Sequence, residues 1–349
     1  YEKAQILKTI LESEGIESVI HGINLIEPSI PGSVRVRIKE IDLQRALRVI
    51  EQVDFTSKTA EDEEETEETN KEILIPVDFS DYTLLTCEFG FKLAKDLKCS
   101  VKLMHAFFTP FYPAAMPFSD AFTLPATDKD LHHDVRKETE SEMKALNAKI
   151  DEYISTGYFP NVTYTSVLSE GLPEEEIISY SRKMKPVAIV MGTKGGSVTA
   201  EVMDGCKTPI FAVPENAKAR NISDINKLVF LTNFQEREFK AFDIMMKFFK
   251  TYPMKLYLAH IAKKDDVWNE IKLSGLQNYL SEEYPHLETE YRLIDPQVNL
   301  EESLEKFVEE NNIDMISLSS SRRNIFARMF NPGIARRMLF HSDTPILVI

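Results

Sequence analysis

Cysteine and long apolar runs are both scarce in this chain of 349 residues, and each scarcity excludes a class of protein. The three cysteines, Cys87, Cys99 and Cys206, have neither paired nor metal-type spacing, so we expect a reducing compartment without disulfides or a cysteine-held metal. No apolar run reaches the length that spans a bilayer, and no signal peptide is visible. The sequence therefore predicts a cytoplasmic protein with no membrane partner.

Basic residues are also in the minority, with 41 against 56 acidic residues and a formal net charge of −15. A protein that binds nucleic acid neutralises phosphates with a basic face. This charge balance therefore argues against nucleic acid as a partner. The length suits two or three domains.

One stretch, residues 187–213, has the pattern of a phosphate-holding turn. An apolar strand at 187–191 is followed by Gly192-Thr193-Lys194-Gly195-Gly196-Ser197, a helix from Val198 to about Cys206, and a second strand at 209–213. Glycines allow backbone N–H groups to approach an anion, and a helix N-terminus favours negative charge. A glycine-rich turn alone also serves plain strand-to-helix connections, so this signal needs support.

The support comes from an internal repeat. The Thr-Pro-Ile at 208–210 recurs at 344–346, the apolar strand before Asp78 recurs before Asn233, and the strand ending at His105 and Ala106 recurs at 256–261. Two copies of one strand-and-helix module therefore fill the chain from about residue 71 onward.

Each copy resembles a universal stress protein domain, whose nucleotide-binding members carry G-x2-G-x9-G-(S/T) after the fourth strand and an Asp after the first. Here Gly192-x2-Gly195 is followed at once by Gly196-Ser197, and Asp78 matches the Asp. The resemblance implies binding of ATP or a related adenine nucleotide, with or without Mg²⁺. It assigns the nucleotide to Pro76, Val77, Asp78, Ala106, Met191, Gly192, Lys194, Gly195, Gly196, Ser197 and Val198.

Both copies depart from the family pattern. The first lacks the nine-residue spacer; either nine residues are missing from the sequence as given, or the native turn is short and the phosphate clamp tight. The second has the full loop length but carries Asn233, Ser319 and Arg322 in place of the Asp and the first two glycines. A long side chain at 322 stands where the backbone should approach phosphate, so we predict that the second copy does not bind ATP in the family's way.

The N-terminal part is organised separately. Residues 1–55 show helical spacing, a strand candidate at 16–21, alternation at 34–38 and a helix after Asp42. With the segment LESEGI at 11–16, they resemble a small α+β signal-transducing domain of bacteria. Residues 56–70 form an acidic stretch without a core-forming pattern, which predicts a solvated linker.

The predicted fold is α/β: two tandem doubly wound parallel-sheet domains of the adenine-nucleotide alpha hydrolase-like kind, at 71–218 and 225–349, after the small α+β domain. We expect strands at 73–77, 101–106, 162–168, 228–231, 255–261, 288–294, 315–318 and 346–349, alternating with helices. In the resembled family the last strands pair across a dyad. We therefore expect 209–213 and 345–349 to pair within the chain as an intramolecular pseudo-dimer.

The chemistry of single residues is weaker evidence. Asp78 alone would be read as a helix-capping acid, and only its combination with the glycine turn favours a nucleotide. Ser197 has no recognisable base for nucleophilic catalysis, and no His, Cys or acidic spacing indicates a metal. We therefore expect no catalytic or metal-binding residue. Trp268, the one tryptophan, is expected in the core.

These observations predict a nucleotide-binding stress-response or signalling protein with its ligand in the first repeat. Two alternatives stay open: a nucleotide-independent scaffold for a regulatory partner, and a slow ATPase or autophosphorylating enzyme. A homodimer and an unidentified protein partner also stay open.

Overall fold

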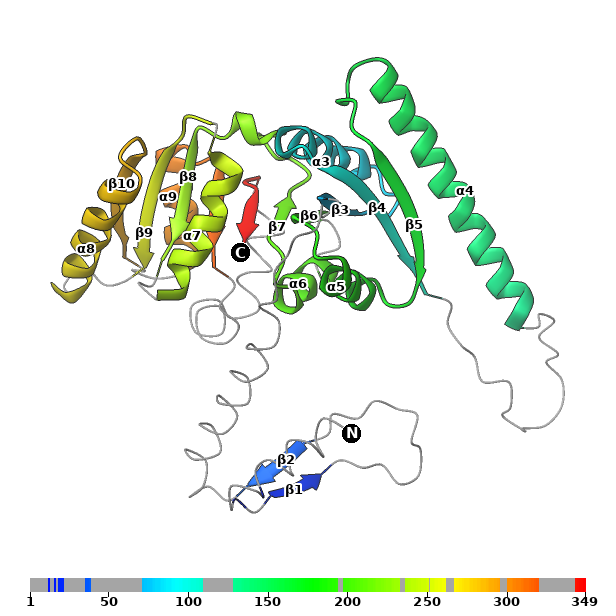
Figure 1. Cartoon of the computed structure of the whole chain (residues 1–349), viewed down its shortest axis with the longest axis horizontal. Helices are drawn as coiled ribbons and strands as arrows, with labels where there is room; N and C mark the ends of the chain where they lie inside the picture. Colours follow the sequence, from blue (N-terminus) through cyan, green and yellow to red (C-terminus); the bar gives the residue numbers. More distant parts are fainter. Residues whose placement is uncertain are drawn as a thin grey trace. The chain divides into compact units, whose positions relative to one another are not determined.

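A computed structural model provides the structure of the chain (Figure 1). It describes residues 12, 16, 18–21, 35–38, 71–108, 128–193, 197–232, 236–250, 252–261, 267–295, 300–319 and 343–349. The chain divides into two compact units, Tyr1–Thr69 and Asn70–Ile349.

The first unit contains an antiparallel pair of strands, β1 (Ser18–His21) and β2 (Arg35–Ile38). The alternation of apolar and basic residues predicted the second strand, and Ile20 lies opposite Val36 in the register. The predicted helix after Asp42 and the acidic linker at 56–70 lie outside the described residues.

The second unit begins with five strands that alternate with helices. Parallel strands buried on both faces need apolar runs, which these segments supply. The elements in order are β3 (Glu72–Pro76), α3 (Thr83–Leu97), β4 (Ser100–Phe107), α4 (Asp128–Ser155), β5 (Tyr164–Glu170), α5 (Pro173–Met184), β6 (Ala188–Gly192), α6 (Ser197–Gly205) and β7 (Ile210–Val213).

A short 3-10 helix, η2 (Ile222–Asp224), leads into a second series of the same kind. It consists of β8 (Lys227–Leu231), α7 (Glu236–Phe249), β9 (Lys255–Ile261), α8 (Val267–Glu283), β10 (Glu288–Ile294), α9 (Leu300–Asn311), β11 (Met315–Leu318) and β12 (Ile346–Val348).

The described strands of this unit form one ten-stranded sheet in the order β10-β9-β8-β11-β12-β7-β6-β3-β4-β5. All neighbours are parallel except β12 and β7, which pair antiparallel. Counted inward from the outer edge of the sheet, each half has its strands in the same order: third, second, first, fourth, fifth. The α/β fold with a mostly parallel sheet is therefore confirmed.

The two halves meet at their last strands, as the sequence predicted. Ile346 lies opposite Ala212, Leu347 opposite Phe211 and Val348 opposite Ile210. Figure 1 shows β12, in red, beside β7. The expected intrachain pairing of 209–213 with 345–349 is confirmed.

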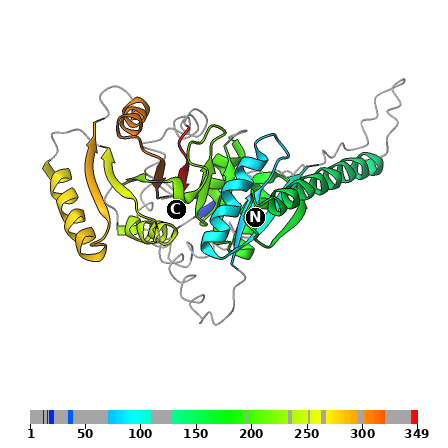
Figure 2. The same cartoon turned by 90° about the horizontal axis from the view of Figure 1, so that it is seen from above.

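Helices cover both faces of the sheet (Figure 2). One apolar cluster joins α3, α4, α7 and α8 to the sheet and runs through both halves. Two separate clusters lie on the other face, one with α9 and one with α5 and α6. Successive strand residues point to opposite faces, so Ile73 and Ile75 belong to the first cluster while Leu74 belongs to the α5–α6 cluster.

Phe211 of β7 sits at the junction of the two halves. Its ring is fully buried and lies 5.6 Å from Phe89 of α3 and 5.2 Å from Phe248 of α7, measured between ring centroids. One side chain therefore packs against a helix from each half.

Several expectations need correction. Trp268, expected in the core, is 69 % exposed on α8. Trp268 is the second residue of α8, and no periodic pattern of apolar residues in the sequence indicated which way its side chain faces. The strand expected from residue 162 begins at Tyr164, the first residue of β5. The three cysteines are free, and all three are buried.

Candidate functional site

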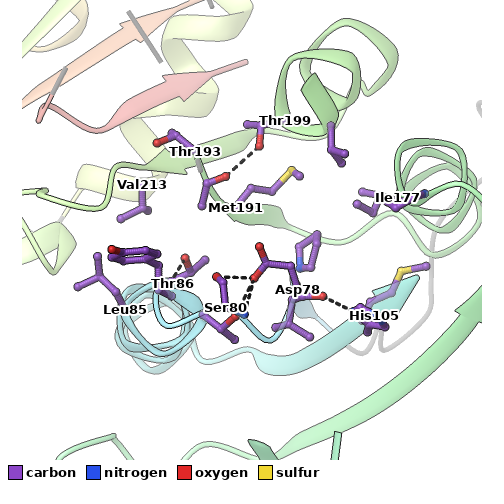
Figure 3. Close-up of a pocket in the computed structure, with 18 of the residues that line it drawn as sticks. Asp78, Ser80, Leu85, Thr86, His105, Ile177, Met191, Thr193, Thr199 and Val213 are labelled. Atoms are coloured by element: carbon purple, nitrogen blue, oxygen red, sulfur yellow. Dashed lines mark hydrogen bonds between the residues drawn. The ribbon is translucent and has the colours of Figure 1, made fainter. Parts of the chain in front are cut away.

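A cavity of about 260 Å³ lies at the carboxyl ends of β3, β4 and β6, where open parallel sheets bind ligands (Figure 3). The first turns of α3 and α5, the start of α6 and the end of β7 complete its wall. Its lining residues are Pro76, Val77, Asp78, Ser80, Tyr82, Thr83, Leu85, Thr86, Met104, His105, Ala106, Pro173, Ile177, Met191, Gly192, Thr193, Val198, Thr199, Val213 and Glu215.

Asp78 lines this cavity and is held in a defined orientation. Its Oδ1 accepts hydrogen bonds from the backbone N–H of Ser80 at 3.1 Å, from Ser80 Oγ at 2.7 Å and from Thr83 Oγ1 at 2.9 Å. Between Asp78 and Ser80, Phe79 takes a left-handed backbone conformation, with φ of 58°. The capping role and the site role therefore coincide, because one carboxylate oxygen ties down the turn while the side chain still lines the cavity.

The charge of Asp78 follows from the same contacts. Burial favours its neutral form, but the hydrogen bonds from Ser80 and Thr83 favour the anion and prevail, so the pKa of Asp78 lies below its ordinary value of 3.8. At neutral pH the Asp78 side chain is therefore an anion. An anion here attracts hydrogen-bond donors and repels phosphate groups.

His105 fixes the backbone just before Asp78. Its Nδ1 lies 2.7 Å from the carbonyl oxygen of Val77. A carbonyl only accepts, so Nδ1 carries the hydrogen of this bond. The ring also packs on Phe79, with 4.3 Å between centroids. The imidazole thus stabilises the turn by hydrogen bonding to Val77 and packing on Phe79.

The opposite wall is built from β6 and α6. Thr199 Oγ1 donates to the carbonyl oxygen of Gly192 at 2.9 Å, which fastens the first turn of α6 to the end of β6. A Cβ at Gly192 would lie 3.1 Å from Thr86 Oγ1, so a side chain there would crowd the hydroxyl from α3. The positive end of the α6 dipole lies at its N-terminus, which begins at Ser197.

The connection before α6 is short. β6 ends at Gly192 and α6 begins at Ser197, so residues 193–196 alone join them. This is an ordinary length for a strand-to-helix connection.

Seven of the predicted residues line the cavity: Pro76, Val77, Asp78, Ala106, Met191, Gly192 and Val198. Lys194, Gly195 and Gly196 lie outside the described residues. Ser197 is the first residue of α6 and is not among the lining residues.

Sequence reasoning missed the hydroxyl side chains Ser80, Thr83, Thr86, Thr193 and Thr199, which line the cavity. Thr83 and Thr86 lie three residues apart in the first turns of α3, so they share a face of that helix. That spacing after Asp78 was the available signal.

The equivalent place in the second half keeps the contact between histidine and backbone carbonyl and changes the nearby side chains. His260 Nδ1 lies 2.7 Å from the carbonyl oxygen of Thr232, as His105 does from that of Val77. Six residues after Thr232, where the first half has Thr83, stands Glu238; its Oε2 accepts from Thr232 Oγ1 at 2.6 Å. A buried carboxyl group thus occupies a position that is a hydroxyl in the first half.

Within the described residues, no group of three or more His, Cys, Asp or Glu side chains has the arrangement of a metal site. The helices of the described parts include none long and apolar enough to cross a membrane.

Comparison with known proteins identifies the first half. Residues 69–214 match the model of the universal stress protein family. A universal stress protein of Methanocaldococcus jannaschii is 25% identical over 158 residues, which cover 42% of this chain and 84% of that protein. The chain therefore contains a universal stress protein domain.

One solved structure of similar fold covers most of the chain. A universal stress protein from Archaeoglobus fulgidus superposes with a TM-score of 0.55 at 15% identity, covering 80% of this chain and 96% of that one. A second Archaeoglobus fulgidus universal stress protein, determined in complex with dAMP, aligns with a TM-score of 0.28 at 16% identity, over 41% of this chain and 98% of that one.

Proposed function

We propose that the universal stress protein domain at residues 69–214 binds one adenine nucleotide, ATP or a relative, and that the chain acts as a nucleotide-responsive stress or signalling protein. The observation that carries the proposal is the convergence of Asp78, Ala106 and Gly192 on one cavity. These three residues come from the ends of three different strands, and the sequence pattern had selected each of them.

The walls of the cavity suit the parts of such a ligand. Val77, Ala106, Met191 and Val198 offer apolar surface to a purine ring. The Asp78 carboxylate suits the amino group of adenine or the hydroxyls of ribose, because both donate hydrogen bonds. The phosphates then point away from Asp78, toward Gly192 and the N-terminus of α6.

The phosphate end of the proposed site extends to Lys194, Gly195, Gly196 and Ser197. Any Mg²⁺ would travel with the phosphates, because Mg²⁺ is usually held by phosphate oxygens, waters and one or two carboxylates. No step of the proposal requires hydrolysis of the nucleotide.

We infer that residues 225–349 form a second, degenerate domain of the same kind, after a first domain at 71–218 and a separate N-terminal domain at 1–55. The shared strand order supports this inference. Asn233, Ser319 and Arg322 replace the Asp and the first two glycines of the family pattern in this copy, so one nucleotide per chain is expected. The edge of β7 is paired within the chain, so a homodimer would need a different surface.

The test is native mass spectrometry and calorimetric titration of the full chain with ATP, ADP and AMP. We expect one nucleotide per chain, and a loss of about tenfold or more in affinity for Asp78→Asn, since hydrogen bonds to charged groups contribute about 1.5–3 kcal/mol. The matched control is Asp134→Asn, on the exposed side of α4.

No binding of any of the three nucleotides, or equal affinity in wild type and Asp78→Asn, would overturn the proposal. The first result would favour a nucleotide-independent scaffold. Turnover of labelled ATP would instead add an enzymatic activity to the site.

A further inference from the structure

Helix α8 carries apolar side chains on two of its faces. Its inner face packs toward the core through three leucines: Leu273, Leu276 and Leu280. On the outside, Trp268, Ile271 and Tyr279 are 69 %, 54 % and 39 % exposed. Spacings of three and eight residues place these three side chains along one side of the helix, and we call them the outer stripe of α8. A surface helix normally has one apolar face, so a second one indicates a second covered face.

The equivalent helix of the first half does not have such a stripe. Helix α4 connects the second and third strands of its half, as α8 does in the other half. Over residues 134–155 of α4, the exposed side chains are charged, serine or alanine. The fold therefore does not require apolar side chains on the outside of this helix, and the outer stripe needs a reason of its own.

The outer stripe also differs from the remaining exposed apolar side chains of the described residues. Those lie at the ends of elements or between them: Phe108, Tyr158, Leu172 and Met184. Single exposed apolar residues are normal, whereas several on one surface mark a place where another molecule binds. Figure 1 shows α8 beside β10, the edge strand of the sheet in this half.

The charges at the end of α8 indicate what that molecule is. Its last turn contains Glu282 and Glu283, both exposed, and no basic residue. Acids at a helix C-terminus are unfavourable, because the helix dipole is negative there and positive at the N-terminus. A second α8 running antiparallel would bring its positive end beside these acids. A parallel second helix would instead bring acids beside acids.

We propose that the outer stripe is the contact surface of a homodimer, in which α8 of one copy packs antiparallel on α8 of a second copy. A twofold axis beside Gly275 brings together positions equally far from it, so Ile271 of each copy lies near Tyr279 of the other. Gly275 is exposed and has no side chain to hold the helices apart. This dimer does not use the edge of β7, which is paired within the chain.

The test is sedimentation velocity and equilibrium of the full chain, from low micromolar to several hundred micromolar protein. Each copy carries a net charge of −15, so two copies repel each other at long range. The measurements are therefore made at about 0.15 M salt, where charges more than about 8 Å apart are largely screened. We expect a reversible and weak monomer–dimer equilibrium, because one pair of helices gives a contact area at the low end of specific interfaces.

A pair of variants links the dimer to the outer stripe. Ile271→Glu places a charge in the contact, and burying it without a partner should weaken dimerisation about tenfold or more. The matched control, Gln277→Glu, adds the same charge at an exposed position of α8 outside the stripe and should change nothing. Both positions are exposed in the single chain, and circular dichroism checks that both variants are folded.

A second pair of variants tests the antiparallel arrangement. In Gly275→Cys, the twofold axis brings the two introduced thiols together, so mild oxidation should give a disulfide-linked dimer. Gln277→Cys should give little of this product. The three native cysteines are buried and serve as an internal background.

A chain that stays monomeric at every concentration, or a dimer that Ile271→Glu leaves unchanged, would rule the proposal out. Equal cross-linking through positions 275 and 277 would rule out the antiparallel contact. The dimer does not depend on nucleotide binding, so failure of that function leaves these measurements decisive.

Discussion

Asp78 in the first half and Glu238 in the second half are acidic residues that differ in their place in the fold and in their hydrogen-bond partners. Asp78 lies on a turn, with its Oδ1 engaged by Ser80 and Thr83. Glu238 lies in the first turn of a helix, with its Oε2 engaged by Thr232. The first half thus has an acid on the loop and a hydroxyl on the helix, and the second half has a hydroxyl on the strand end and an acid on the helix.

The lowered pKa of Asp78 predicts a pH dependence of stability. Its folded-state pKa lies below the ordinary 3.8, so its contribution is complete above that value and is lost as the pH falls below it. Asp78→Asn should therefore cost about 1 kcal/mol at neutral pH, and less in acid. Denaturant unfolding of both proteins across that range measures the difference; a difference that grows toward acid would contradict the prediction.

Single residues also show where sequence reasoning succeeded and failed. Asp78 and Gly192 could be selected because each follows a recognisable buried strand. Thr199 could not, since its role depends on the carbonyl of Gly192, seven residues away and brought close by the turn. Trp268 was misjudged because residue type alone argued for burial, and its exposure depends on which face of α8 meets the sheet.

At the scale of the element, two helical glycines make a matched pair. Gly90 lies in α3 where a Cβ would come within 2.3 Å of Ile75 Cδ1, so the helix approaches β3 closely. Gly275 lies in α8, where an added Cβ would meet no atom within 4 Å. The same substitution should therefore have opposite effects in the two helices.

We expect Gly90→Ala to destabilise the protein by about 1–3 kcal/mol through overpacking. Gly275→Ala should stabilise it by about 0.5–1 kcal/mol through helix propensity. Thermal and denaturant unfolding measure both. Destabilisation by Gly275→Ala would contradict the prediction and would mean that α8 requires glycine at this position.

The elements themselves were largely predictable. Apolar runs and alternating helices predicted the parallel strands within one or two residues, because a strand buried on both faces needs such a run. The resemblance to the family implied the pairing of β7 with β12, although no local pattern specifies it.

At the scale of the whole unit, the core on the α3–α7 face is continuous through the junction. Phe211 contributes to both halves of it, through Phe89 and Phe248. Phe159 is buried as well, but its ring contacts are with Phe91, Tyr153 and Tyr158, all in the first half. The two phenylalanines therefore differ in reach rather than in burial.

Phe211→Ala should cost about 3–5 kcal/mol and loosen both halves, whereas Phe159→Ala should cost a similar amount and loosen the first alone. Hydrogen exchange read separately on α3 and α7 distinguishes them. Protection that falls on α3 only, in both variants, would show that the halves unfold independently.

The antiparallel pairing of β7 with β12 also bears on how such a protein can change over generations. In a symmetric dimer of identical chains, every substitution appears twice, so a change that helps one site alters the other as well. Here both partners of the pairing are encoded in one chain, and each can mutate alone. Thr83 in one half and Glu238 in the other are a difference of this kind, which a dimer of identical subunits could not have acquired.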